Sequence, residues 1–419
     1  MLRILKDAWK IPDLKKRILY TVLLLIVFRI GAHIPVPFVD KAAIANLFGA
    51  DGNTLFGLAN IVSGRALQQA TIFAMSITPY INSSIIMQLL TVAIPALERL
   101  QKEGEEGRKK LGQWTRYVTV ILAFVQAAGL YMGIVDQSQK GALAFFTVVM
   151  SFTAGTAFLM WLGEQINEKG VGNGISLIIF AGILSGGPAG VQSLILNSNN
   201  NYFIVALVAI IAVVVIGFVV LMNNAERRIP VQYAKRVVGR KMYGGQSTHI
   251  PIKVAMAGVL PIIFAVSLMA FPATIAQMFG HTAASTGFWG GFVRAVSPGN
   301  WWYSIIYFVL IIAFTFFYTE IQFNPIEIAN NMKNNGGSIS GIRPGKPTSD
   351  FIRMILSRIT LVGAIFIALI AVLPTLLTSV NPAFAFGGTS LLIVVGVALE
   401  TVKQIESQML MRHYKGFLE

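Results

Sequence analysis

The lysine and arginine residues of this chain alternate between the connections that join its hydrophobic runs. When the chain is divided at these runs, 28 of its 33 Lys and Arg residues fall on every second connection. The other five are Arg29, Lys41, Arg65, Lys140 and Arg294. Positive residues beside membrane spans stay on the cytoplasmic side. The pattern predicts a protein that crosses the bilayer many times in a fixed orientation, with its N- and C-termini inside.

The composition agrees with one integral membrane bundle rather than several soluble domains. Of the 419 residues, 55% are hydrophobic and 12% are charged, whereas soluble domains carry about 25% charged residues. On a soluble protein the net charge of +15 would favour nucleic-acid binding. Here the charges flank spans, so topology is the simpler explanation. The sequence has no cysteine and its four histidines show no metal-binding spacing, so we expect no metal site.

Ten segments have the length and apolar character of a membrane span, which requires about 20 residues. They are residues 16–32, 68–95, 114–135, 142–162, 174–190, 202–222, 254–278, 302–321, 354–376 and 386–405. The predicted fold is therefore an all-α membrane protein of two five-helix halves, residues 1–190 and 191–419. An odd number of spans in each half fits an inverted repeat, in which a path forms between the halves.

The predicted spans lack the charged residues that ion-coupled transporters place inside the membrane. Arg29, Glu320 and Glu400 lie towards span ends, where long side chains reach the interface. A small-molecule transporter is thus disfavoured, although carbonyls at broken helices remain possible Na⁺ ligands. The sequence contains neither a phosphate-binding Gly-x-x-x-x-Gly-Lys loop nor a Gly-x-Ser-x-Gly elbow. We expect no enzyme activity and no cofactor.

The stretch from Asp51 to Gln69 is too short and too polar to cross the membrane, and it precedes the second span on the predicted outer side. Its apolar residues form one short face, made of Leu55, Phe56, Leu58, Ile61 and Val62. Two interpretations remain open. The stretch is either a half-helix that re-enters the bundle, which requires burial in protein or a cavity, or a helix that lies flat at the interface.

The second span carries three isoleucines on one helix face. Ile77, Ile81 and Ile85 follow i, i+4 spacing, and Pro79 is expected to kink the helix. Spacing alone favours ordinary packing or lipid contact, while a dry pore constriction is the alternative.

Gln88 and Gln126 lie in the second and third predicted spans. The simpler interpretation is a hydrogen bond between neighbouring helices. The alternative is a seam that opens.

Two inner connections, residues 223–253 and 322–353, are too long for simple turns. The first carries Arg227, Arg228, Lys235, Arg236, Arg240 and Lys241. The second presents Arg343 between Gly341 and Gly345 in a turn stiffened by prolines, followed by Lys346. A rigidly held arginine suits a two-pronged contact to a partner carboxylate. Plain topology signals and attraction to anionic lipid are the alternatives.

Several long runs resemble the bacterial SecY family, in order and over nearly the whole chain. They are SITPYINSSIIMQLLT, WLGEQINEKGVGNGIS, QSTHIPIKVAMAGVLP, NPIEIANNMKNNGG, GIRPGKPT and FGGTSLLIVVGV. The resemblance implies a passive protein-conducting channel in the bacterial plasma membrane. Its pore would have an hourglass shape between the two halves and would open sideways to lipid. A pore-free scaffold or insertase is a further competing class.

The resemblance also implies roles for particular residues. It assigns the pore ring to Ile77, Ile81, Ile179, Ile263 and Ile393. It assigns the plug to Leu55, Phe56, Gly57, Leu58, Ala59, Asn60, Ile61, Val62, Ser63, Gly64 and Arg65. Gln88 and Gln126 match lateral-gate positions, and Arg343 matches an arginine that couples to the SecA motor. The expected partners are SecE, SecG, SecA, the ribosome, signal peptides, translocating polypeptides and lipid. The only nucleic-acid contact expected is to ribosomal RNA through the two inner connections.

Overall fold

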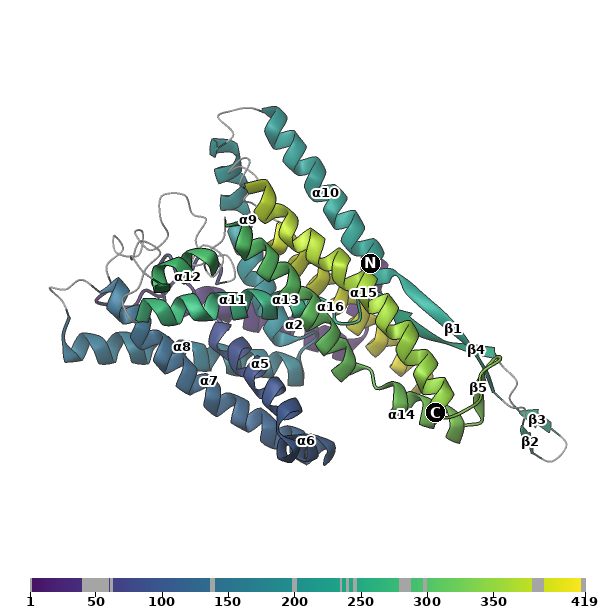
Figure 1. Ribbon diagram of the computed structural model, residues 1–419. Helices are drawn as coiled ribbons and strands as arrows, with labels where there is room; N and C mark the ends of the chain where they lie inside the picture. The colour runs from purple at the N-terminus through teal and green to yellow at the C-terminus, as the bar shows by residue number, and fades with distance from the viewer. Residues whose placement is uncertain are drawn as a thin grey trace.

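The chain folds into a long bundle of helices with a small sheet at one end, as the computed structural model in Figure 1 shows. The structure describes residues 2–39, 60, 63–135, 140–197, 202–233, 236–238, 241–243, 247–278, 288–296, 300–378 and 388–415. The first group of helices is α1 Leu2–Lys10, α2 Pro12–Gly31, α5 Thr78–Ala93, α6 Pro95–Lys102, α7 Glu105–Ile134, α8 Ala142–Lys169 and α9 Gly174–Asn197. The second group is α10 Tyr202–Asn224, α11 Leu260–Met278, α12 Phe288–Val296, α13 Trp301–Gln322, α14 Pro325–Asn334, α15 Lys346–Thr378 and α16 Gly388–Lys415.

Each of the ten predicted spans overlaps one of these helices, so the helical fold class is confirmed. Within the described ranges, six helices are long and apolar enough to cross a membrane. A seventh is added if the bent pair α5 and α6 forms one span. The count of ten spans therefore stays a prediction. Several helix starts follow from local chemistry, since Asn300 and Asn324 accept hydrogen bonds from the first turns of α13 and α14.

The second predicted span differs most from its prediction. Helix α5 begins at Thr78 rather than near residue 68, and residues 63–77 form turns. Arg65, Ala70 and Ser76 have positive φ angles, which an α-helix does not contain. Pro79 does not kink the helix, because it lies in the first turn, where its missing N–H is not needed. The sharp bend comes later, with 101° between α5 and α6.

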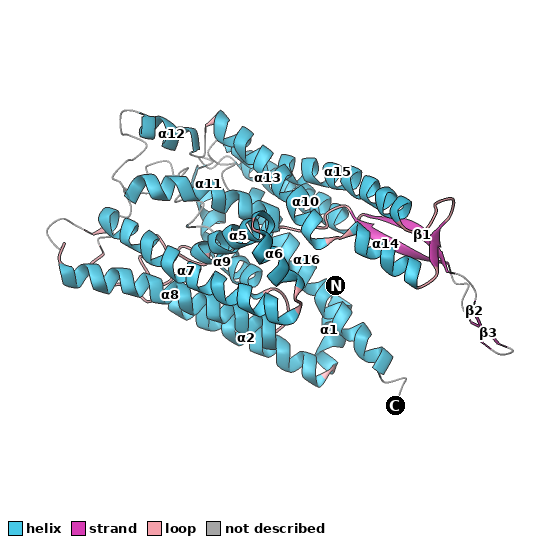
Figure 2. Cartoon of the chain, turned by 60° about the horizontal axis from the view of Figure 1, so that its bottom comes forward, coloured by secondary structure: helices cyan, strands magenta, loops and turns pink. Residues whose placement is uncertain are grey.

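The two groups of helices pack within themselves and meet along a central seam. In Figures 1 and 2, α7 and α8 run along one side, α13 and α15 lie on the other, and α5 and α11 lie between them. Helix α11 contacts both α5 and α7, and α16 contacts α9 and α1. The largest apolar cluster joins residues from both groups across this seam. The centre of the molecule is therefore an apolar interface between the groups.

A three-stranded antiparallel sheet forms from the two long connections that the sequence presented only as loops. Its order is β4–β1–β5, with β1 Glu226–Tyr233, β4 Ser247–Lys253 and β5 Gly337–Ile339. Val231 pairs with Thr248 on one side and with Ile339 on the other. The strands β2 Arg236–Val238 and β3 Lys241–Tyr243 form a separate hairpin. Both views show the sheet projecting from one end of the bundle, beside α14.

Candidate functional site

The five isoleucines assigned to the pore ring all belong to the large apolar cluster in the centre of the bundle. Their positions are Ile77 and Ile81 at the start of α5, Ile179 in α9, Ile263 in α11 and Ile393 in α16. All five are between 1% and 6% exposed and belong to the same apolar cluster. Four helices far apart in sequence thus contribute these side chains to one buried apolar region, in which the isoleucines themselves offer no group for chemistry.

Helix α5 also carries buried polar side chains whose hydrogen-bonding capacity is not filled. Gln88 donates its amide to Ser84 Oγ over 3.3 Å, but its Oε1 is buried and has no partner among the described residues. The same holds for Asn82 Nδ2 on this helix and for Ser76 Oγ just before it. Such groups are uncommon in packed interiors, because each loses its water without compensation. Gln126 of α7, the helix that packs against α5, is buried as well.

The structure describes only the end of the segment assigned to the plug. Asn60, Ser63, Gly64 and Arg65 are described, whereas Leu55, Phe56, Gly57, Leu58, Ala59, Ile61 and Val62 lie outside the described residues. Ser63 and Gly64 are buried, and Arg65 is exposed. Gly64 and Arg65 adopt the left-handed backbone conformation, with φ angles of 65° and 68°. The segment therefore ends in a tight turn.

The basic residues assigned to partner docking lie at the sheet end of the molecule. Arg227 and Arg228 are exposed on β1, and an Arg228 Nη is 2.7 Å from Glu226 Oε1. Arg236 and Lys241 begin β2 and β3. Lys235 and Arg240 lie outside the described residues.

Arg343 projects from a turn whose shape is held by its neighbours. Its side chain is exposed, while its carbonyl accepts a hydrogen bond from Thr348 Oγ1 over 2.8 Å. Gly341 and Gly345 flank it with φ angles of 82° and 103°. Lys346 is exposed at the start of α15. The turn therefore presents the guanidinium of Arg343 to solvent on a fixed backbone.

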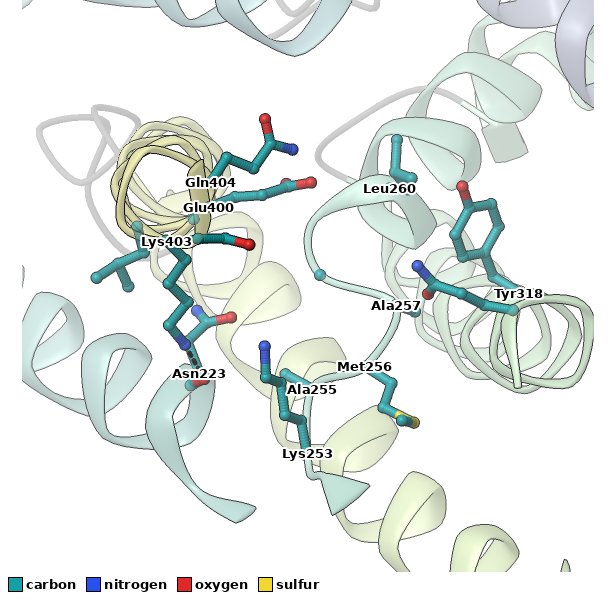
Figure 3. Close-up of a pocket in the computed structure, with 15 residues that line it drawn as sticks. Asn223, Lys253, Ala255, Met256, Ala257, Leu260, Tyr318, Glu400, Lys403 and Gln404 are labelled. Carbon is teal, nitrogen blue, oxygen red and sulfur yellow. Dashed lines mark hydrogen bonds between the residues drawn. The ribbon is translucent and has the colours of Figure 1, made fainter. Parts of the chain in front are cut away.

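A pocket of about 340 Å³ with both polar and apolar lining residues lies where α16, α13 and the end of β4 converge, and nothing in the sequence indicates it. Figure 3 shows Glu400 and Gln404 on the α16 side, Tyr318 opposite, and Lys253 reaching in from β4. Lys403 donates its Nζ to the carbonyl oxygen of Asn223 over 2.8 Å. The sequence predicts Glu400 only as a residue near a span end, and it carries no local signal that Tyr318 and Lys253 line the same pocket.

Comparison with known proteins supports the channel interpretation of this geometry. The SecY family model matches residues 71–402. Among the relatives, the protein translocase subunits SecY of Streptomyces lividans and Halalkalibacterium halodurans are 46% and 45% identical, and each alignment covers 100% of both chains.

Solved structures show the same fold at lower identity. A protein-conducting channel has a TM-score of 0.66 at 21% identity and covers 94% of this chain and 92% of its own. A SecY channel studied for its plug domain scores 0.68 at 22% identity, with the same coverage. Sec61 from the canine ribosome–channel complex scores 0.64 at 20% identity, again covering 94% and 92%. The chain belongs to the SecY family of protein translocase subunits, and it is a membrane channel for proteins rather than an enzyme.

Proposed function

We propose that the chain conducts unfolded polypeptides through a pore lined at its narrowest point by Ile77, Ile81, Ile179, Ile263 and Ile393. The observation that carries this proposal is their joint burial in one apolar cluster at the seam between the two groups of helices. Aliphatic side chains make no obligatory hydrogen bonds, so a ring of them accommodates many passing sequences. When no polypeptide is present, the same ring excludes water and ions.

The two halves of the channel are residues 1–190 and 191–419, related as an inverted repeat of five spans each. The lateral gate lies where α5 and α7 face α11 and α13. Contacts of α11 with both helices support a closed seam in this structure. The unfilled hydrogen-bonding capacity of Gln88 lowers the cost of opening, because an incoming chain or water supplies the missing donor. Apolar segments of about 20 residues then leave through the gate into lipid.

Residues 55–65 form the plug that covers the outer side of the ring. In the related SecY protein, the plug domain stabilises the closed state and maintains a membrane seal. The tight turn at Gly64 and Arg65 supports a defined end for this segment. Entry of a signal peptide displaces the plug outwards.

Partner docking takes place on the connections 223–253 and 322–353. Two structural neighbours, canine Sec61 and a yeast Ssh1 complex, are bound to ribosomes. The ribosome is therefore one expected partner. Its RNA would contact the basic residues of these two connections. The SecA motor ATPase is the other, and it engages Arg343. SecE and SecG complete the complex. The channel lies in the bacterial plasma membrane with both termini in the cytoplasm, as the Lys and Arg distribution indicates.

The ring is tested by replacing Ile81, Ile179 and Ile263 together with serine and recording ion conductance in planar bilayers. We expect a clear rise in leak, because three hydroxyl groups wet the constriction. Ile210→Ser, at an exposed position on α10, is the control and leaves conductance unchanged. A folded triple variant that conducts no more ions than the parent would refute the ring.

A further inference from the structure

Arg29 is an arginine near the end of an apolar helix, far from the cationic connections. It lies in the last turn of α2, and its Nη1 donates a hydrogen bond to Ser185 Oγ of α9 over 2.8 Å. The guanidinium is only partly exposed. Charged residues inside membrane segments are costly and are usually kept for a function. The channel mechanism described above gives Arg29 no role.

Ser185 is held in one orientation by this hydrogen bond and a second one. Its Oγ donates to the carbonyl oxygen of Gly182 over 2.7 Å. A serine hydroxyl has a single proton. The proton is committed to Gly182, so the lone pairs of the same oxygen accept from Arg29. Arg29 thereby fixes the side chain of Ser185 and joins α2 to α9.

Gly64, near the end of the plug segment, rests on the surface that Ser185 and Gly182 form. A Cβ atom at Gly64 would lie 2.8 Å from Ser185 Oγ and 2.9 Å from Gly182 Cα. Both distances are shorter than a carbon atom tolerates, so only glycine fits, and its φ of 65° also favours glycine. The backbone at residue 64 is thus in direct contact with the oxygen that Arg29 binds.

Hydrogen bonds join the described residues on either side of Gly64. The Asn60 side chain accepts from the Gln68 backbone N–H over 3.1 Å and donates to Gln68 Oε1 over 3.3 Å. The Asn60 carbonyl accepts from Arg65 N over 2.8 Å and from Ser63 Oγ over 3.0 Å. Asn60, the first described residue of the plug segment, is therefore tied to the residues on both sides of Gly64.

We propose that Arg29 is a positioning residue that holds the plug end in its closed place. It acts through Ser185, because the Ser185 hydroxyl and the nearby Gly182 backbone pack against Gly64. This inference rests on the proposed plug function of residues 55–65. It differs from simple snorkelling of Arg29 to the interface, because snorkelling requires no partner at residue 185.

The test compares Arg29→Met, Ser185→Ala and the double variant as complete translocase complexes in planar bilayers. The measured quantity is the fraction of time that the channel conducts ions without substrate. Each single variant is expected to raise it about tenfold, the factor for losing one charge-assisted hydrogen bond. The double variant shows no further rise, since both changes break the same contact. Arg29→Lys, which keeps a cationic donor, restores most of the seal.

Lys140→Met is the matched control, because this exposed cation donates to the Met132 carbonyl and forms no hydrogen bond with Arg29, Ser185 or Gly64 among the described residues. The variant leaves the conducting fraction unchanged. Thermal unfolding verifies that each variant is folded. If Arg29→Met fails to assemble, Ser185→Ala alone tests whether the contact between Arg29 and Ser185 keeps the channel closed. Folded variants that seal normally, or single effects that add in the double variant, would overturn the role of Arg29.

Deleting residues 55–62 separates this inference from the proposed function beneath it. If the deletion leaks and Arg29→Met does not, the plug stands and Arg29 has no part in it. If the deletion seals like the parent, the plug assignment itself is wrong, and the inference is overturned with it.

Discussion

Isoleucine suits the proposed constriction because its branched side chain has few rotamers and no polar atom. The i, i+4 spacing of Ile77 and Ile81 is equally typical of ordinary packing, and both residues are indeed packed. The structure places them in the same apolar cluster as Ile179, Ile263 and Ile393 from three other helices. Membership of that cluster depends on three-dimensional contact, so spacing alone gives no indication of it.

Gly155 of α8 is a residue whose substitution has a predictable effect on stability. A Cβ there would lie 1.9 Å from the carbonyl oxygen of Ile72. We expect Gly155→Ala to destabilise the folded protein by about 1–3 kcal/mol through overpacking. Gly187→Ala in α9, where the new carbon has no neighbour within 4 Å, is the control, with an effect near zero or a gain of up to about 1 kcal/mol. Thermal unfolding in detergent measures both, and equal melting temperatures would contradict the packing.

Arg343 offers a test of motor coupling at single-residue resolution. We expect Arg343→Glu to abolish SecA-driven translocation in vesicles, because charge reversal would repel the carboxylate that we propose on the partner. Thr348→Val removes the hydroxyl that holds the Arg343 carbonyl and should reduce the rate partially, by about threefold to tenfold for one hydrogen bond. Lys333→Glu, an exposed cation of α14, controls for charge. Full activity of Arg343→Glu in an assembled complex would exclude the coupling role.

At the scale of elements, the sheet formed by β1, β4 and β5 was not predicted, although one of its strands has a signal in the sequence. Ile229 and Val231 are buried, whereas Arg228, Pro230 and Gln232 are exposed. This period of two is the signal of a strand, and it lay within a segment read only for its charges. The pairing of β1 with β5, more than a hundred residues later in the chain, had no local signal.

The sheet carries basic residues that we propose for partner docking, and this link is testable. Val231 packs with Ile252 and Ile339 in one apolar cluster. Burying a carboxylate there is costly, so Val231→Asp is expected to expose the sheet to protease and to weaken ribosome binding at least tenfold. Gln232→Asp, on the opposite exposed face, leaves protease resistance intact. Ribosome binding by Val231→Asp as tight as that by Gln232→Asp, with the sheet opened to protease, would show that the sheet contributes nothing to docking.

At the scale of the whole molecule, two groups of helices meet along a seam that contains the isoleucine cluster. Because the chain has no cysteine, single cysteines report the path of a translocating polypeptide without background. A stalled secretory chain should crosslink to Cys at Ile81 and Ile263. It should not crosslink to Cys at Val213, which is 68% exposed on the outside of α10. Equal crosslinking at all three sites would argue against a central path.

The orientation of the molecule in the membrane is tested in the same cysteine-free background. Cysteine at Arg228 should react with a membrane-impermeant thiol reagent only from the cytoplasmic side. Cysteine at Lys140 should react only from the opposite side. The reverse labelling pattern would contradict the orientation that the charge distribution predicts.

The sequence by itself determined the helical membrane class, the approximate position of most helices and the expected orientation. These depend on hydropathy and charge, which are local along the chain. Only the tertiary structure decided that α5 begins at Thr78, that the two long connections form one sheet, and that Arg29 reaches Ser185 across 156 residues. These three features depend on contacts between residues that are far apart in the chain. Such contacts produce no periodic pattern in the sequence around either residue, so they could not be predicted locally.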